Sequence, residues 1–330
     1  MEDAVSVCTD FDTKRKISFF AVFDGHGGSN CANFCREHYT RILKSNFDDS
    51  NISNSLTKTS LIVDRMYRDE TEKNKAKNDE SGAVGVIVLV TPESIFTANV
   101  GDCRAVRDSH SSMFISHKKQ TRTQVLCRDN KSVPSSSSLM KESEIESMFQ
   151  NMSLDNSTTN ALALSRDHKA GEIVSETERV ERAGAIIENG ELRLKGSTNA
   201  YVGFTRAYGD FTYKTKECPA LIAEPEITVT KRSPDSDLFL VLACDGVWDV
   251  MTNQECSNFV HQALKSTSDL SELCSKLLFR CLEKGSTDNM SCIIVLFEGV
   301  DASIGRASMD SPRSGDTTTT SNRGIRKALF

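Results

Sequence analysis

The chain has 330 residues and a formal net charge of −6 at pH 7, so its length suits one large domain or two small ones. Basic and acidic residues are interspersed without a basic stripe, and we therefore expect no nucleic-acid partner. No window approaches the roughly 20 apolar residues that span a bilayer, and the acidic start is unlike a signal peptide. We expect a protein without a membrane span, located in the cytoplasm, the nucleus or both.

The cysteines and histidines argue against disulfides and zinc. Eleven cysteines are scattered along the chain, an odd number without framework spacing. No Cys-x-x-Cys pair occurs, and the six histidines are not grouped at metal-ligand spacing. The pattern predicts free, mostly buried thiols and no structural zinc site.

The first strong signal along the chain is an apolar run over 17–23 that ends in Asp24-Gly25-His26-Gly27-Gly28. A continuous apolar run is typical of a strand covered on both faces, and the glycines permit a sharp turn or a close approach to a ligand. A single Asp-Gly after a strand is most often an ordinary turn. Here, however, the arrangement recurs farther along the chain.

Three later aspartates also stand beside strand-like segments. Asp102 follows 95–100, Asp245 follows the apolar run 238–244, and Asp288 precedes 292–297. Carboxylates delivered by strand ends favour a shared site for a hard cation such as Mg²⁺ or Mn²⁺, since zinc would normally recruit His or Cys.

The remaining periodicity predicts an α+β fold, with strands clustered toward both ends of the chain and helices between them. Turn residues Thr91–Ser94 join two strands into a hairpin, and Trp248 and Phe239 are expected in the core. The predicted strands cover 17–23, 84–90, 95–100, 238–244 and 292–297, and the predicted helices cover 29–44, 56–75, 175–183, 253–264 and 268–283.

Two polar segments interrupt or follow this pattern. We expect a catalytic domain over 1–298 with a disordered insertion at about 108–159, and a disordered Ser/Thr-rich tail over 299–330, because neither segment has enough apolar residues to offset the entropy of ordering. Ser308 and Ser311 in the tail are candidate phosphorylation sites or simply part of a solvated tail.

Seven short motifs follow one another in a characteristic order: Met1-Glu2-Asp3-Ala4, Phe23-Asp24-Gly25-His26-Gly27-Gly28, Asn99-Val100-Gly101-Asp102-Cys103-Arg104, Asp167-His168-Lys169, Thr205-Arg206-Ala207-Tyr208-Gly209-Asp210, Asp245-Gly246-Val247-Trp248-Asp249 and Asp288-Asn289-Met290-Ser291. In these motifs and their order, over about residues 1 to 298, the chain resembles the metal-dependent serine/threonine protein phosphatases of type 2C. Any one motif is weak, but seven in order are specific.

The resemblance implies a sandwich of two antiparallel-rich β-sheets flanked by α-helices, with a two-metal cluster at one end. Asp24 resembles the carboxylate that bridges both ions. The carbonyl of Gly25 and the carboxylate of Glu2 resemble ligands of the second ion, and Asp3 matches a neighbour that acts through water.

The same resemblance assigns Asp245 and Asp288 to the first ion. Asp102, together with Asp245, resembles the site of a weaker third ion, and Asn289 supports the ligands. The implied cofactors are Mg²⁺ or Mn²⁺, and the implied substrates are phosphoproteins of signal transduction. The family expectation for the oligomeric state is a monomer.

The expected chemistry follows from the charge of the substrate. A phosphate monoester dianion repels nucleophiles, so its hydrolysis needs positive charge at the phosphoryl oxygens and a nucleophile that is already ionised. Two divalent ions supply both. We expect in-line attack of a metal-bound hydroxide on phosphoserine or phosphothreonine, with Asp24 and His26 as the catalytic residues and His26 as the general acid. The plainer interpretation of His26 is a hydrogen-bonded turn residue.

The chain departs from the family pattern in three places, one of which is the insertion after Asp102 that lengthens a normally short connection. The chain also starts inside the first motif, so the phosphate-binding Arg and the first strand of the family are expected to be missing. This favours reduced activity and, as the alternative function, a non-catalytic pseudophosphatase or scaffold. In addition, Ser81-Gly82-Ala83-Val84 stands where the family more often has Gly-Ser/Thr-Thr-Ala, so a hydroxyl near the metal waters is lost.

The remaining motif residues receive structural interpretations. Arg206 and Asp210 are expected to form an ion pair beside the site, and 167–169 to pack near the substrate groove. A cysteine-dependent tyrosine phosphatase is disfavoured, because Cys35-x5-Arg41 lacks the glycines that would wrap backbone N–H groups around a phosphate.

Overall fold

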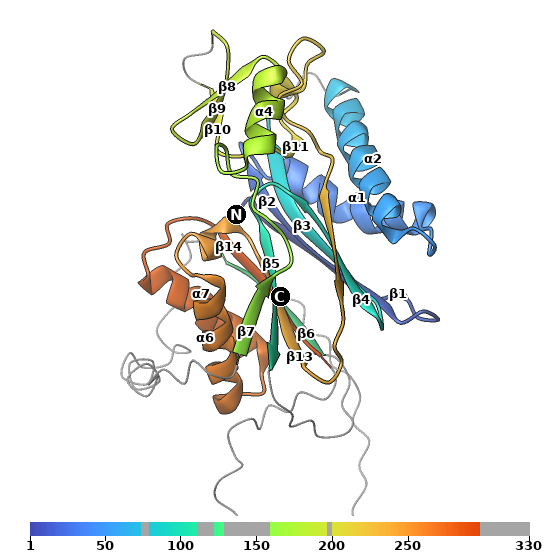
Figure 1. The fold of residues 1–330 in the computed structure, drawn as a ribbon, viewed down its shortest axis with the longest axis vertical. Helices are drawn as coiled ribbons and strands as arrows, with labels where there is room; N and C mark the ends of the chain where they lie inside the picture. Colours follow the sequence, from blue (N-terminus) through green and yellow to red (C-terminus); the bar gives the residue numbers. More distant parts are fainter. Residues whose placement is uncertain (74–78, 111–121, 129–158, 197–199, 298–330) are drawn as a thin grey trace, which may run out of the picture.

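Two antiparallel sheets pack face to face, with helices on both outer faces of the sandwich (Figure 1). The structure is a computed structural model that describes residues 1–73, 79–110, 122–128, 159–196 and 200–297. No helix within these ranges is both long and apolar enough to cross a membrane.

The first sheet carries the Asp24 motif on one of its inner strands. Its two outer-face helices are α1 (Asn30–Asn46) and α2 (Ile52–Lys73). Side chains alternate along β2, so Phe19 and Phe23 pack against these helices while Phe20 and Val22 face the second sheet. The strand order is β1 (Ala4–Asp12), β2 (Ile17–His26), β3 (Gly82–Val90), β4 (Ser94–Val100) and β12 (Glu226–Lys231), and the short β11 (Tyr208–Gly209) also pairs with β3.

The second sheet carries the Asp245 motif at the end of its central strand. The short helix α5 (Asp245–Trp248) follows that strand directly, and α6 (Asn253–Ser266) and α7 (Leu270–Glu283) cover the outer face. A capping box between Thr252 and Glu255 fixes the start of α6. The strand order is β6 (Arg122–Arg128), β14 (Met290–Leu296), β13 (Asp237–Ala243), β5 (Arg104–His110) and β7 (Thr159–Ala163).

A small third sheet lies at one end of the molecule (Figure 1). It consists of β10 (Tyr201–Val202), β9 (Glu191–Leu194) and β8 (Ala185–Glu188), accompanied by α4 (Val174–Arg182) and, after β11, the 3₁₀ turn η2 (Phe211–Tyr213). Glu176 on α4 pairs with Arg206 at 2.7 Å and Arg179 at 2.9 Å. Burial alone would raise the pKa of Glu176, but the two arginines lower it to about 2. The buried ion pairs tie α4 to the segment before β11.

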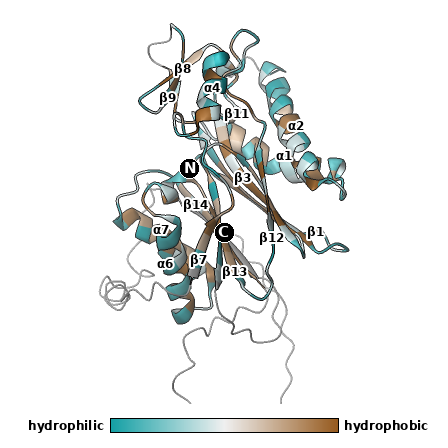
Figure 2. Ribbon diagram, viewed as in Figure 1, coloured by the Kyte–Doolittle hydropathy of each residue, from teal (hydrophilic) through white to brown (hydrophobic). Residues whose placement is uncertain are grey.

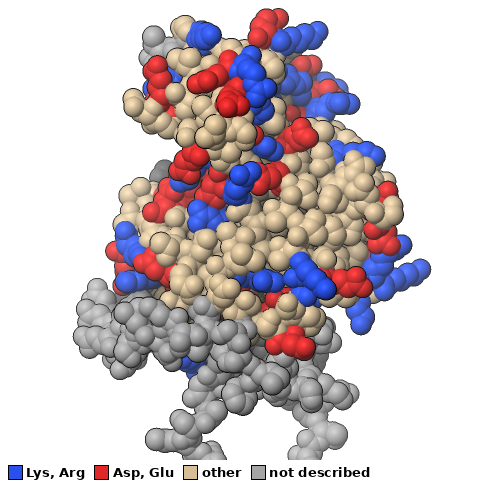
Figure 3. All heavy atoms as spheres, viewed as in Figure 1, with Lys and Arg blue, Asp and Glu red and all other residues tan. Residues whose placement is uncertain are grey.

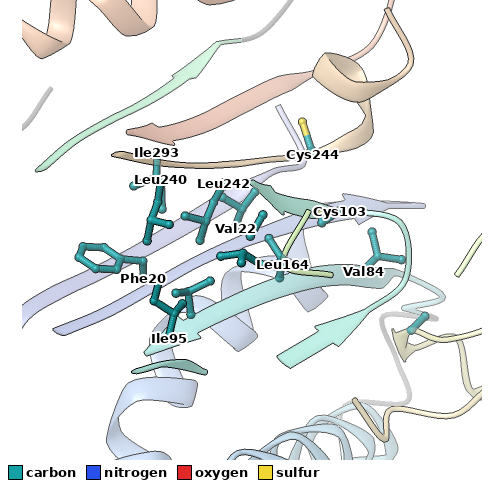
Figure 4. Packing of buried hydrophobic residues seen from close by; sticks show 14 of the residues in the cluster. Phe20, Val22, Val84, Ile95, Cys103, Leu164, Leu240, Leu242, Cys244 and Ile293 are labelled. Carbon is teal, nitrogen blue, oxygen red and sulfur yellow. The ribbon is translucent and has the colours of Figure 1, made fainter. Parts of the chain in front are cut away.

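The core between the two main sheets explains the continuous apolar runs in the sequence. Figure 4 shows Phe20 and Val22 of the first sheet packed against Leu240 and Leu242 of the second, with Val84 farther along the same core. Every residue of β3 and of β14 is buried, since each strand has the opposite sheet on one face and helices on the other. Figure 2 shows the same arrangement as hydrophobic strands between helices with hydrophilic outer faces.

The structure confirms the predicted α+β sandwich and the elements with strong periodicity. Each predicted strand and helix corresponds to an observed one, with boundaries shifted by a few residues. The predicted hairpin between β3 and β4 is present, and Thr91 N–H donates to the Ser94 carbonyl at 2.9 Å. Trp248 and Phe239 are buried, and no disulfide joins the cysteines of the described residues. The small third sheet and the strands β1, β5, β7 and β12 were not predicted.

The predicted insertion begins too early and contains a strand. Residues 108–110 belong to β5, and β6 lies at 122–128, where it pairs with β14 along its whole length. The strand β6 was not predicted, because its polar and apolar residues do not alternate regularly and the segments around it are polar. The rest of the expected insertion, and the tail with Ser308 and Ser311, lie outside the described residues, so those expectations stay predictions.

A buried histidine beneath the site makes the stability depend on pH. His168 is 0% exposed, and its Nδ1 lies 3.2 Å from the backbone N and 3.1 Å from the backbone O of Gly101. Burial, and then the charge of Arg206, lower its pKa from 6.5 to about 4. The folded state therefore favours neutral His168, so its contribution to stability is complete above pH 6.5 and is lost as the pH falls toward 4. The difference corresponds to about 3 kcal/mol.

We expect His168→Gln to flatten the acid side of the stability curve. In metal-free denaturant titrations between pH 7 and pH 4, the wild type should lose up to about 3 kcal/mol more free energy of unfolding than the variant. Parallel curves for the two proteins would show that His168 is protonated in the fold as easily as in the unfolded chain.

Candidate metal centre

The predicted ligands converge where strands of the two main sheets end side by side. Asp24 stands near the end of β2, opposite Val84 of β3. Asp245 begins α5 directly after β13 of the second sheet. Asp102 follows β4 and is buried at 7% exposure. Rigid strands with both faces covered thus hold these carboxylates.

Two glycines let separate segments close around this point. A Cβ on Gly25 would come closer than 3.0 Å to the backbone oxygen of Glu2. A Cβ on Gly246 would come equally close to the backbone oxygen of Asn289. Neither glycine has a positive φ, so close backbone approach is the reason for both. They bring the N-terminal segment and the 285–289 loop against the ends of β2 and α5.

The gathered carboxylates repel one another. Burial, followed by the charges of Asp3, Asp245, Asp102 and Asp288, raises the pKa of Asp24 well above its usual 3.8. Burial and the charge of Asp245 raise the pKa of Asp102 to about 7. Burial, with Asp249 and Asp288, raises that of Asp245 to about 6. A cation between these groups would remove the repulsion that shifts all three.

Several carboxylate oxygens at this point are also left without donors. Both oxygens of Asp3 and Oδ1 of Asp245 are buried and accept no hydrogen bond from the described residues. Buried carboxylate oxygens normally receive hydrogen bonds or bind a cation. The residues therefore fit a divalent ion.

The donor set indicates a hard cation. Sγ of Cys244 and oxygens of Asp3 and Asp24 lie within 4.8 Å of one another, so a thiol is near. However, Ser291 N–H donates to this sulfur at 3.2 Å, the S–H group donates to the Asn289 carbonyl at 3.5 Å, and burial raises the pKa of the thiol well above 9.0. A protonated thiol that is already hydrogen-bonded is a poor ligand. The carboxylate oxygens remain, and they suit Mg²⁺ or Mn²⁺.

The other predicted ligands lie at the rim of the cluster. The backbone N–H of Glu2 donates to Oδ1 of Asn289 at 3.0 Å, which links the N-terminal segment to the 285–289 loop. Asp288 is exposed, and its Oδ1 accepts the N–H of Asn289 at 2.6 Å. Its charge nevertheless acts on Asp3, Asp24 and Asp245. All of the predicted residues thus meet in one region, with the oxygens of Asp288 open to solvent.

His26 pairs with Asp210, for which the sequence analysis predicted Arg206 as the partner. Its Nε2 lies 2.8 Å from Oδ2 of Asp210, and a carboxylate can only accept, so the ring nitrogen donates. The predicted ion pair between Arg206 and Asp210 is wrong, because Arg206 bonds to Glu176 instead. Burial lowers the pKa of His26, but the hydrogen bond and charge of Asp210 outweigh it and raise the pKa above 6.5.

Two further ion pairs at the rim were missed. Lys169 Nζ lies 2.5 Å from Asp249, and its charge lowers the pKa of Asp102 and Asp245. Arg104 donates to Asp167 at 2.9 and 2.5 Å. Both pairs come from motifs that the sequence singled out, but a motif does not show which basic residue meets which acidic one. Figure 3 shows acidic and basic side chains mixed over the visible face, without a basic stripe.

Comparisons with known proteins show the family of the chain. The family model described as Protein phosphatase 2C matches residues 1–124 and 152–290. Protein phosphatase 1A of Bos taurus is 32% identical over 312 residues, covering 90% of this chain and 67% of the relative. Probable protein phosphatase 2C 5 of Paramecium tetraurelia is 30% identical over 318 residues, covering 90% of this chain and 88% of the relative.

A solved structure supports the fold alone. The crystal structure of serine-threonine phosphatase 2C from Toxoplasma gondii has a TM-score of 0.63 at 18% identity and covers 90% of each chain. With the family match and the identities above, the chain belongs to the protein phosphatase 2C family, and its class is that of the protein serine/threonine phosphatases. The unmatched stretch 125–151 falls inside the predicted insertion.

We expect Mn²⁺ to stabilise the wild-type chain and not a variant of the cluster. At 100 times its Kd the ion should add about 2.7 kcal/mol and raise Tm by several degrees. Asp24→Asn removes one repelling carboxylate, so without metal this variant should be at least as stable as the wild type, and its response to Mn²⁺ should disappear. Thermal unfolding with and without Mn²⁺ measures both effects.

The matched control is Asp10→Asn, an exposed aspartate of β1 away from the cluster. It should keep the full Mn²⁺ response. An equal response in Asp24→Asn and the wild type would place the ion elsewhere.

Proposed function

We propose that the chain hydrolyses phosphoserine and phosphothreonine in proteins with the help of Mg²⁺ or Mn²⁺. The observation that carries this proposal is the cluster of buried, mutually repelling carboxylates with unpartnered oxygens. Both the repulsion and the unsatisfied oxygens call for divalent cations. The family membership supplies the substrate class, since the relatives named above are protein phosphatases.

In this proposal Asp24 would contribute to the sites of two ions. Asp245 and Asp288 would hold one ion, while Glu2 and the carbonyl of Gly25 would hold the other. Asp102 with Asp245 would hold a weaker third, and Asp3 and Asn289 would orient the ligands. When bound, the ions lower the pKa of a water molecule and neutralise the phosphoryl oxygens.

His26 supplies the proton in the proposed reaction. The departing serine or threonine alkoxide is a strong base, so its departure is slow unless an acid protonates the oxygen as the P–O bond breaks. His26 stands two residues from Asp24 on the same strand and is 32% exposed, and the hydrogen bond and charge of Asp210 raise its pKa above 6.5, which favours the protonated ring. In the proposal it gives its proton to the leaving oxygen of a phosphate bound at the cluster.

The proposal includes the setting of the enzyme. Its substrates are phosphoproteins of signalling pathways in the cytoplasm or nucleus, and it acts as a monomer. The alternative is a pseudophosphatase that binds metal and phosphoproteins without turnover. Metal uptake and phosphate release, followed in the same titration, separate the two.

Phosphatase activity on a phosphothreonine peptide should vanish with a chelator and return with Mn²⁺ or Mg²⁺. Asp24→Asn and Asp245→Asn should each lower kcat/KM at least 100-fold, because each removes a ligand from the proposed centre. Phosphate release measured across a Mn²⁺ titration tests this, with Asp10→Asn as the control. Activity that a chelator does not change would contradict the proposal. Metal uptake without phosphate release would favour the pseudophosphatase.

A further inference from the structure

Asp210 is held in an unusual backbone conformation that aims its carboxylate at His26. Its φ is 49° and its ψ is 44°, the left-handed region that residues other than glycine, asparagine and aspartate rarely adopt. Tyr213 N–H donates to the carbonyl of Asp210 at 2.9 Å and closes the turn. The carboxylate is 7% exposed, and its Oδ2 lies 2.8 Å from Nε2 of His26. Strained residues of this kind persist where the surroundings fix them.

The segment before Asp210 is itself anchored from below. Gly209 N–H donates to Oδ1 of Asp64 at 2.8 Å. The same oxygen pairs with Lys214 at 2.7 Å, and Lys214 also donates to the Ala207 carbonyl. These bonds join α2, β11 and η2, so the position of Asp210 is set by three elements.

A glycine on the neighbouring strand leaves room for the pair. Gly82 of β3 lies opposite His26 of β2 and opposite Gly209 of β11. A Cβ on Gly82 would come closer than 3.0 Å to Oδ2 of Asp210 and to Nε2 of His26. Gly82 does not have a positive φ, so the backbone does not require glycine there. The absence of a side chain at Gly82 is what permits the two polar groups to meet.

An aromatic ring also lies beside the imidazole. The ring of Phe204 lies 4.9 Å from that of His26, centroid to centroid. Among the described residues, Asp210 is the one hydrogen-bond partner that the structure gives the imidazole. With Nε2 committed to Asp210, Nδ1 is the nitrogen left to reach a substrate oxygen.

We propose that Asp210 is a positioning residue for His26, and that Gly82 provides the space in which it acts. Asp210 accepts a hydrogen bond from Nε2–H, fixes the ring orientation and keeps Nε2 protonated throughout. Nδ1 then gives its proton to the serine or threonine oxygen as the P–O bond breaks, which leaves a neutral ring still bonded to Asp210. This inference rests on the proposed function, in which His26 is the acid.

Substrates that differ in their leaving group provide the test. The leaving group of a phosphothreonine peptide is an alkoxide, which needs the proton. The leaving group of p-nitrophenyl phosphate is a weakly basic phenolate, which does not. Asp210→Asn keeps the side-chain size and tolerates the left-handed backbone. We expect kcat of the full chain with Mn²⁺ to fall about 10- to 100-fold on the peptide and less than about threefold on p-nitrophenyl phosphate.

Gly82→Ala should give the same selective loss, because its methyl group pushes Asp210 and His26 apart. Gly203→Ala is the matched control: a Cβ there meets nothing within 4 Å and Gly203 has no positive φ, so both activities should stay unchanged. The variants should also keep the wild-type Tm shift with Mn²⁺. A fall of equal size on both substrates in Asp210→Asn would overturn the inference, since it would indicate a merely structural role.

A spectroscopic readout is independent of turnover. In the metal-free protein, ¹⁵N shifts of the His26 ring should show Nε2 protonated in the wild type and a changed proton distribution in Asp210→Asn. Identical shifts in the two proteins would contradict the positioning role.

His26→Gln distinguishes the acid role of His26 from the positioning role of Asp210. If this variant loses peptide activity selectively and Asp210→Asn does not, the positioning role fails and the acid role stands. If His26→Gln loses both activities equally, the acid role fails and the inference fails with it. In the double variant, we expect no further loss on the peptide beyond that of His26→Gln alone.

Discussion

Repulsion among buried carboxylates is the constraint on which the rest of this structure depends. Asp24, Asp102 and Asp245 come from different strand ends, and burial first, then the charges of neighbouring carboxylates, raise the pKa of each. The sandwich can hold them because its apolar core fixes the strands on both faces (Figure 4). Holding the carboxylates together lowers the stability of the metal-free fold at this end of the sandwich, and a bound cation would restore it. Such local destabilisation is common at functional sites.

Close backbone approach is the second constraint, and glycine meets it at each critical contact. Gly25 admits the segment that carries Glu2 and Asp3, Gly246 admits the loop of Asp288, and Gly82 admits the contact between His26 and its partner. Each contact joins segments that are distant in the sequence. The carboxylate cluster and His26 therefore depend on the same packing of strand ends, and that packing sets their relative position without any ion or substrate.

The sequence allowed the fold class and the carboxylates of the centre to be predicted, because apolar strands and Asp-Gly turns are local signals. It did not show β6, whose seven residues lie between polar segments, or the small third sheet, whose strands are too short for periodicity. It also gave the wrong partner for Asp210. Asp210 pairs with His26 and not with Arg206 because its backbone φ is positive and because Gly82 has no side chain where the pair lies. Neither is visible in the order of residues.

The account is tested most directly by anomalous X-ray diffraction from crystals of the chain grown with Mn²⁺. It predicts two strong manganese peaks on either side of the Asp24 carboxylate, one next to Asp245 and the other next to the Gly25 carbonyl. It also predicts that His26 and Asp210 remain in hydrogen-bond contact in the same crystals. No manganese at Asp24, with the carboxylates still gathered and buried, would contradict the claim that this cluster exists to bind metal.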